Sequence, residues 1–286
     1  MKMNDKFIMY GLKLLPKKRL SRFIGSMARK SFSRHFIRLY MRLFSIDLSD
    51  VKKPIHEFEH LLDFFIRELK PGSRPIASDQ DAIVSPVDGV ISQFGTIRNG
   101  ELIQAKGINY TLEELLDGNR AYIDQFNGGQ FITIYLSPKD YHRIHAPVSG
   151  QVKQISYFPG ALYPVNEAGV RLIPGLFAKN ERLVTFIERE SGPVALIKVG
   201  ATNVGSIRLS FDDEIITNPA REKQKLDKLY HPPISFAKGD EVGWFEFGST
   251  IILLFRPNQM KWMDAIEEGK SVRMGECIAQ SDISNS

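Results

Sequence analysis

The chain has few of the residues that build covalent or metal-bound frameworks. Cys277 is its single cysteine in 286 residues, which excludes an intramolecular disulfide framework and any zinc or iron–sulfur site made of several cysteines. The densest uncharged apolar run, Ile251–Phe255, is far shorter than the ~20 residues that cross a bilayer as a helix. Lys and Arg interrupt the apolar pieces near the N-terminus, so we expect no secretory signal peptide.

Several enzyme motifs are absent as well. The sequence has no G-x-S-x-G nucleophile elbow, no P-loop and no G-x-G-x-x-G dinucleotide motif. Hydrophobic residues make up 43% of the chain and charged residues 25%, which are ordinary values for a folded protein. Wholesale disorder is therefore excluded.

Acidic residues are scarce at one end of the chain. The first 45 residues contain 12 Lys or Arg and, among acidic residues, only Asp5, whereas the other 241 contain 26 basic and 32 acidic residues. A basic arm, residues 1–45, therefore precedes an acidic body, residues 46–286. Such an arm requires an anionic partner.

The apolar residues of the arm recur at helical spacing between residues 19 and 44, with Arg and Lys on the opposite side. They are Leu20, Phe23, Ile24, Met27, Phe36, Ile37, Tyr40 and Phe44. This pattern, together with an apolar piece at residues 7–15, favours amphipathic helices that lie in a membrane interface. Surface helices packed on the protein's own core, a nucleic-acid-binding arm and a mitochondrial presequence are the alternatives.

The body reads mainly as β structure. A helix is expected from His56 to Leu69, and a short capped helix from Leu112 to Leu116. From Ile83 onward, β-branched and aromatic runs alternate with Gly, Pro, Asn and Asp, without a βαβ rhythm. The expected strands are Gly89–Phe94, Phe131–Leu136, Gln151–Tyr157, Leu183–Glu188, Val194–Val199 and Ile251–Phe255. We predict an α+β fold, a mostly antiparallel β body preceded by amphipathic N-terminal helices.

Three glycine-containing segments of the body resemble one another. Residues 86–91 (PVDGVI) recur as residues 147–152 (PVSGQV), and residues 238–243 (KGDEVG) resemble the turn of biotinyl- and lipoyl-type domains. A match of this length is too short to prove a repeat. It predicts stacked, barrel-sandwich-like hairpins that are turned by glycine.

His142 and His145 stand out among the six histidines. A spacing of three can place two imidazoles on one helical face to bind a metal. Pro138 and Pro147 leave room only for a turn, and no third ligand is apparent, so we expect no metal site. Either histidine taken alone is more often structural.

Gly248-Ser249-Thr250 separates two strongly apolar runs near the C-terminus. Such a set usually marks a bulge or a tight turn. A serine hydroxyl can also attack the carbonyl of the preceding residue, and a glycine there removes the Cβ that would crowd the five-membered ring. A nearby His–Asp pair would act as the base. Elimination of the resulting ester, followed by hydrolysis, leaves a pyruvoyl group on the new N-terminus.

Taken together, these residues resemble the phosphatidylserine decarboxylase family in its bacterial, membrane-associated proenzyme form. The resemblance is carried by S-P-V-D-G around Asp88, D-Y-H-R-I-H at residues 140–145 and G-S-T at residues 248–250. It extends through residues 104–107, 176–182 and 199–207, and the basic arm is similar to the family's membrane-binding N-terminus. Phe247 is a departure, because many members carry Leu there, but both side chains are bulky and apolar.

The resemblance implies a carboxy-lyase that converts phosphatidylserine into phosphatidylethanolamine and CO2 through a Schiff base with a pyruvoyl group. It assigns self-processing to Asp88, His145 and Ser249, and decarboxylation to His142. Cleavage between Gly248 and Ser249 would give a beta chain, residues 1–248, and an alpha chain, residues 249–286.

The expected partners are phosphatidylserine, an anionic membrane surface, and the protein's own two chains as a heterodimer, with a dimer of heterodimers left open. No nucleic acid and no metal are expected, and the expected location is peripheral, on the cytoplasmic face of a bacterial cell membrane. The alternative is a non-enzymatic β scaffold at a membrane surface, in which Gly-Ser-Thr is only a turn.

Overall fold

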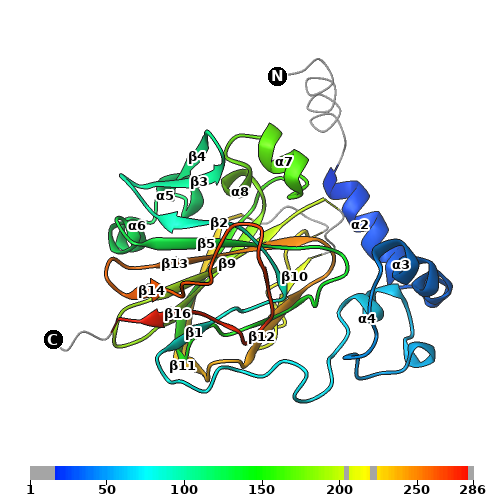
Figure 1. The fold of residues 1–286 in the computed structure, drawn as a ribbon. Helices are drawn as coiled ribbons and strands as arrows, with labels where there is room; N and C mark the ends of the chain where they lie inside the picture. Colours follow the sequence, from blue (N-terminus) through cyan, green and yellow to red (C-terminus); the bar gives the residue numbers. More distant parts are fainter. Residues whose placement is uncertain (1–16, 203–205, 220–223, 283–286) are drawn as a thin grey trace.

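The computed structural model describes residues 17–202, 206–219 and 224–282. A β-rich body occupies one side of the molecule and a group of short helices the other (Figure 1). The helices of this group are α2 (Lys17–Ala28), the 3-10 helices η1 (Ser31–Phe36) and η2 (Ile55–Glu57), α3 (Ile37–Phe44) and α4 (Leu61–Phe65). The described part of the basic arm thus lies in a helical layer that also includes η2 and α4 from the start of the body.

An eight-stranded antiparallel sheet forms the centre of the body, in the order β11-β7-β8-β9-β13-β5-β2-β15. Its strands are β2 (Gly89–Thr96), β5 (Gln130–Leu136), β7 (Gly150–Phe158), β8 (Arg182–Glu188), β9 (Val194–Gly200), β11 (Leu226–Phe236), β13 (Ser249–Phe255) and β15 (Ser271–Val272). All six predicted strands lie in this sheet, so the predicted α+β fold with a mostly antiparallel body is confirmed.

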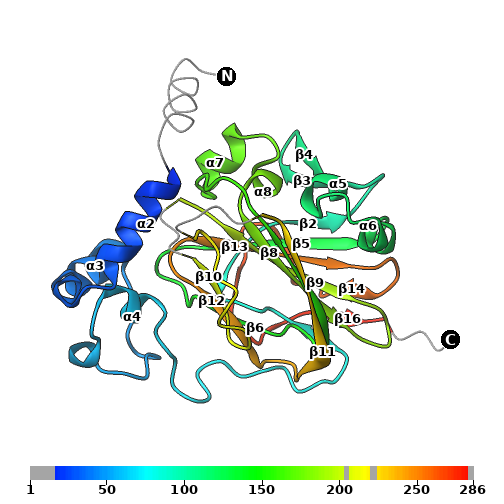
Figure 2. The ribbon, with the colours of Figure 1, turned by 180° about the vertical axis from the view of Figure 1, so that it is seen from behind.

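The large sheet is covered on both faces. Two three-stranded sheets pack on one face, and helices together with a hairpin pack on the other, as the reverse view shows (Figure 2). The small sheets consist of β1 (Ala82–Val84), β16 (Cys277–Ser281) and β14 (Met260–Trp262), and of β10 (Ile207–Leu209), β12 (Glu241–Phe245) and β6 (Arg143–His145). The other face carries β3 (Glu101–Ala105), β4 (Ile108–Thr111), α5 (Leu112–Leu115), α6 (Arg120–Phe126), α7 (Glu167–Leu172) and α8 (Leu176–Lys179).

This double cover explains why β13 is apolar without interruption. Ile251 and Leu253 point into the core between the sheets, whereas Ile252 and Leu254 point into the core beneath the helices. A strand that is buried on both faces reads as a continuous hydrophobic run rather than an alternating one. The same alternation directs the side chain of Ser249 toward the core between the sheets.

The three glycine-containing segments do meet in space. Val84 N donates to Pro147 O at 3.0 Å, and Ala146 N donates to Asp240 O at 2.8 Å. Gly89 and Gly150, which occupy equivalent positions in the first two segments, each begin a strand of the large sheet. A Cβ on either would lie within 2.6 Å of a carbonyl oxygen of the neighbouring strand. Only glycine permits these two close approaches.

Of the two helices predicted in the body, the first is mostly wrong and the second is confirmed. The helix expected from His56 to Leu69 is wrong beyond the short pieces η2 and α4. His60 is extended and its Nδ1 accepts a hydrogen bond from Asp63 N, so α4 starts only at Leu61. At the far end Lys52 N donates to Glu68 O, and Leu69 forms a β-bridge with Val51. The capped helix expected at Leu112–Leu116 is confirmed, with Thr111 and Glu114 in a capping box.

The arm is helical, as expected, but its helix is interrupted. Ser33 causes the interruption, because its hydroxyl donates to Ala28 O and accepts from Leu61 N, which ties η1 to α4. The apolar piece at residues 7–15 lies outside the described residues. Within the described part of the chain, no helix is long and apolar enough to span a membrane.

Candidate active site

Ser249 begins β13 and is completely buried. Its backbone lies between Leu136 of β5 and Gly200 of β9 in the register of the sheet. A serine hydroxyl in such a position has no competing bulk solvent. Its reactivity therefore depends on the few groups that surround it.

The two residues before Ser249 have unusual backbone conformations. Phe247 has φ of 77° and Gly248 φ of 22°, both in the left-handed region. For a bulky residue such as Phe247 this conformation is an outlier that the surroundings must enforce. Phe247 is buried, and its ring packs at 4.6 Å from that of Phe65. Strain is therefore stored next to the Gly248–Ser249 peptide bond.

His142 is the histidine in contact with Ser249. Its Nε2 lies 3.0 Å from Ser137 O and its Nδ1 lies 3.5 Å from Ser249 Oγ. A carbonyl oxygen can only accept, so Nε2 carries the proton and Nδ1 presents its lone pair to the hydroxyl. The imidazole also stacks on Phe65 at 4.0 Å, which fixes the plane of the ring.

Burial keeps His142 neutral. Desolvation, helped by the positive charge of Arg67, lowers the pKa of His142 to about 3, against the smaller opposing effect of the hydrogen bond to Ser137. The imidazole is therefore uncharged at physiological pH. In that state its Nδ1 can accept a hydrogen bond from Ser249.

His145 lies at the end of β6 in a different environment. Its Nδ1 donates to Gly239 O at 2.8 Å, and its Nε2 accepts from the hydroxyl of Tyr141 at 3.1 Å. Burial lowers the pKa of His145, while the Gly239 hydrogen bond and the charges of Glu241 and Asp88 act in the opposite direction. Its ring nitrogens are thus both engaged in the uncleaved chain.

Asp88 is held by two partners. Arg74 donates to both carboxylate oxygens through Nε and Nη2 at 2.6–3.0 Å, and Met274 N donates at 2.8 Å. The backbone of His145 donates to Pro86 O, two residues before Asp88, so the two predicted residues belong to one neighbourhood. The structure therefore brings His142 into contact with Ser249, whereas Asp88 and His145 are neighbours whose side chains bond to other groups.

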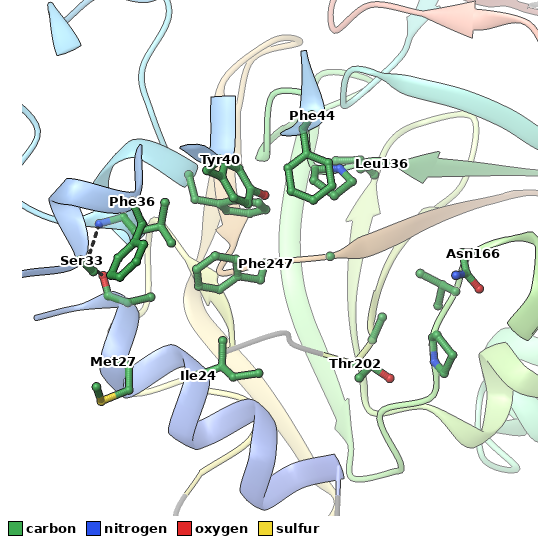
Figure 3. A pocket seen from close by; sticks show the side chains of 18 of the residues that line it. Ile24, Met27, Ser33, Phe36, Tyr40, Phe44, Leu136, Asn166, Thr202 and Phe247 are labelled. Carbon is green, nitrogen blue, oxygen red and sulfur yellow. Dashed lines mark hydrogen bonds between the residues drawn. The ribbon is translucent and has the colours of Figure 1, made fainter. Parts of the chain in front are cut away.

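An apolar cavity of about 560 Å³ leads to the Gly248–Ser249 bond (Figure 3). Helices α2 and α3 form one wall, with Ile24, Tyr40 and Phe44, and the body forms the other, with Pro164 and Thr202. Phe247 reaches into the cavity between Ile24 and Tyr40. Gly248 is also one of the residues that line the cavity. The cavity thus connects the arm with the strained turn.

One segment matches a zinc-binding sequence motif but does not adopt the helical conformation that the motif requires. Residues 56–60 read H-E-F-E-H and so match H-E-x-x-H, a motif that binds zinc when both histidines share one helical face. Here η2 ends at Glu57, and His60 is an extended N-cap. Among the described residues, no group of three or more His, Cys, Asp or Glu side chains is arranged to hold a metal ion.

Sequence reasoning missed several residues of the site. Phe65 and Arg74 carry no local signal, because their partners His142 and Asp88 are distant in sequence. Glu246 could have been noticed as the one acidic residue in the apolar run from Trp244 to Phe255. It is buried and lies two residues before Gly248.

Comparison with known proteins identifies sequences that this chain resembles. The family model described as phosphatidylserine decarboxylase matches residues 61–280. A phosphatidylserine decarboxylase proenzyme of Brevibacillus brevis is 48% identical over 266 residues, which cover 93% of this chain and 94% of the relative. The proenzymes of Pseudomonas fluorescens and Pseudomonas aeruginosa are 39% and 40% identical, each over 98% of this chain and over 100% and 98% of their own lengths.

Proposed function

The chain belongs to the phosphatidylserine decarboxylase family, and from this premise we propose which residues carry out its reactions. The protein is a pyruvoyl-dependent, self-processing carboxy-lyase that converts phosphatidylserine into phosphatidylethanolamine and CO2. The non-enzymatic scaffold is not favoured. The proposal concerns the cleavage point, the role of each histidine and the attachment to the membrane.

Self-processing starts at Ser249. Its Oγ attacks the carbonyl carbon of Gly248, the C–N bond breaks, and the released amine takes the hydroxyl proton. A base then removes the Cα proton of residue 249, and the Cβ–O bond breaks to leave a carboxylate on Gly248. Loss of ammonia on hydrolysis gives the pyruvoyl group. The strain at Phe247 and Gly248 supports this cleavage point, because opening the peptide bond releases it.

We propose that His145 is the base that activates the Ser249 hydroxyl for attack, and that Asp88 orients His145 and stabilises its charged form. The support is that burial lowers the pKa of His145, which favours the neutral imidazole, while the negative charge of Asp88 acts in the opposite direction and favours the charged form. To reach Ser249 its ring must leave Tyr141 and Gly239. His142 is the second candidate for this base, because its Nδ1 already faces the hydroxyl.

We assign decarboxylation to His142. The contact between His142 and Ser249 supports this role, because residue 249 is the one that becomes the pyruvoyl group. The residues fit that group: the position is buried, apolar on the cavity side and next to an imidazole. The pyruvoyl carbonyl supplies the electron sink for loss of CO2. Binding of an anionic head group raises the pKa of His142, which can then deliver a proton to the substrate carbon.

The two chains produced by cleavage, residues 1–248 and 249–286, stay together in this proposal. β13 belongs to the short chain but is hydrogen-bonded along its length to β5 and β9 of the long chain. β16 and β15 add pairings with β1 and β2. A heterodimer therefore keeps the complete sheet.

We propose that residues 1–45 attach the catalytic body, residues 46–286, to an anionic membrane on its cytoplasmic face. Large apolar side chains on the described part of the arm are exposed and accompany its basic residues, a combination typical of helices in the membrane interface. The exposed apolar residues are Leu20, Phe23, Met27, Phe32, Phe36, Leu39, Leu43 and Phe44. Because the same helices line the cavity, a lipid head group has a short route to Gly248.

Ser249→Ala tests the proposed nucleophile. The variant is expected to remain a single chain and to form no phosphatidylethanolamine from phosphatidylserine vesicles, because no pyruvoyl group can arise. Ser156→Ala is the matched control, since Ser156 is equally buried on β7 and hydrogen-bonds Asp227 instead. Activity in Ser249→Ala would refute the proposal.

A further inference from the structure

Glu246 is a buried carboxylate, 5% exposed, on the turn that carries the scissile bond. Its side chain accepts hydrogen bonds from Arg29 Nη2 and Ser206 Oγ. Arg208 approaches the second carboxylate oxygen, with Nε at 3.6 Å from Oε1. The carboxylate thus joins the arm, the segment before β10 and the turn.

The residue before Arg29 and the residue after Glu246 lie in the same hydrophobic cluster. Ala28 and Phe247 are members of one buried cluster that also contains Leu62 and Phe65. Two consecutive arm residues are therefore linked to two consecutive residues of the turn, Arg29 through charge and Ala28 through a shared buried cluster. Arg29 is separated from Glu246 by 217 positions in sequence, so this contact exists only in the folded chain.

The turn requires such support. Phe247 has a positive φ that a bulky side chain adopts only when its surroundings impose it. Phe247 also packs on Phe65, the residue that stacks on His142. A displacement of Glu246 would therefore move both the scissile peptide and the imidazole next to Ser249.

We infer that Arg29 and Glu246 are positioning residues for self-cleavage, and that the arm is a working part of the processing site as well as a membrane attachment. This inference rests on the proposed cleavage at Gly248–Ser249. The ion pair fixes the turn in the conformation in which Ser249 Oγ can reach the carbonyl of Gly248.

The experiment measures the cleavage rate of freshly produced full-length precursor on denaturing gels. Arg29→Met and Glu246→Gln are each expected to slow cleavage about tenfold, the effect of losing one charge-assisted hydrogen bond. The double variant should be no slower than Glu246→Gln alone, because that substitution already removes the ion pair that Arg29 makes. Arg29→Lys keeps the charge and should restore cleavage to within about threefold of wild type.

Arg120→Met is the matched control, because it breaks an exposed ion pair between Arg120 on α6 and Glu113 on α5, away from the turn. It should cleave at the wild-type rate. A second measurement compares melting temperatures in the uncleavable Ser249→Ala background, where Arg29→Met should cause no large loss. An unchanged melting temperature would show that the Arg29–Glu246 pair acts on the turn rather than on the stability of the whole fold.

Three results would overturn the inference. One is wild-type cleavage in Arg29→Met, and another is multiplied rather than shared effects in the double variant. The third is a slowing that tracks a loss of melting temperature and is not relieved by Arg29→Lys, which would make the pair a fold element only. Failure of the wild-type chain to cleave would instead reject the proposed function.

Discussion

Around His142 the molecule is apolar and closed, whereas around His145 it is polar and charged. His142 stacks on Phe65 and contacts Ser249, and the charge that most affects it is the guanidinium of Arg67. His145 bonds to Tyr141 and Gly239 and is influenced by Glu241, Arg143 and Asp88. Two imidazoles three residues apart thus have opposite surroundings.

These surroundings determine which chemistry each imidazole can perform. An imidazole near carboxylates can be stabilised in its charged form, as a base needs after it has taken a proton. An imidazole in an apolar pocket stays neutral until an anion enters, as a proton donor to an anionic substrate requires. The chain passes between the two environments within residues 142–145.

The largest expected effect is loss of self-cleavage in His145→Ala. Ser249 then lacks its base, so only uncleaved precursor should appear on a denaturing gel. His231→Ala, which removes another histidine of the body, serves as the control and should cleave normally. Normal cleavage in His145→Ala would give the role of the base to His142.

His142→Ala tests the role of the other histidine, which we assign to decarboxylation. We expect the chain to cleave but to decarboxylate phosphatidylserine about 10²–10⁴-fold more slowly, the usual range for a positioned acid or base. The measurement is the rate of phosphatidylethanolamine formation per cleaved chain. Loss of cleavage in this variant would contradict the division of roles between the two histidines.

The buried histidine also predicts a pH dependence of stability. The pKa of His142 is about 3 in the folded chain and near 6.5 in the unfolded chain, so between these two pH values mainly the unfolded chain binds the proton. Stability is complete above pH 6.5 and falls in acid, by about 2 kcal/mol at pH 5 from this residue.

Denaturant unfolding at pH 7 and pH 5 measures this contribution. Ser249→Ala should lose more stability between the two pH values than Ser249→Ala with His142→Gln, because glutamine does not titrate. Both proteins contain the same carboxylates, so the contribution of these groups to the pH dependence of stability cancels in the difference. Equal losses would show that His142 is protonated in the folded chain.

The smallest expected effect concerns the arm. Phe23 and Leu43 are 63% and 68% exposed, and burying one such side chain contributes roughly 1.5–3 kcal/mol. Phe23→Ser with Leu43→Ser should therefore weaken co-sedimentation with anionic vesicles at every salt concentration and leave cleavage intact. Leu229→Ser is the control, because Leu229 is 60% exposed on β11 of the body. Unchanged binding of the double variant would mean that these side chains do not enter lipid.

Much of the β body could be predicted from sequence because its signals are local. β-branched and aromatic runs bounded by glycine and proline indicated all six expected strands, and Thr111 with Glu114 marked a helix start. The helix predicted from His56 to Leu69 was wrong because tertiary contacts determine the backbone conformation there. The amide of Leu61 donates to the hydroxyl of Ser33, and the carbonyl of Glu68 accepts from the amide of Lys52.

The site was predictable to a similar extent. Gly248 and Ser249 could be singled out because their chemistry depends on adjacent residues. The contact of His142 with Ser249 could not, since it joins residues 107 positions apart, and neither could the bonds of Arg74 to Asp88 or of Arg29 to Glu246. Such contacts depend on the packing of the arm and two sheets, which no local pattern records.

The most direct measurement is the intact mass of purified, active protein. Self-cleavage at Gly248–Ser249 predicts two chains, residues 1–248 and 249–286, with a pyruvoyl group in place of the serine at the start of the short chain. A single mass for the full chain in active protein would contradict this cleavage, and so would a short chain that begins with intact Ser249.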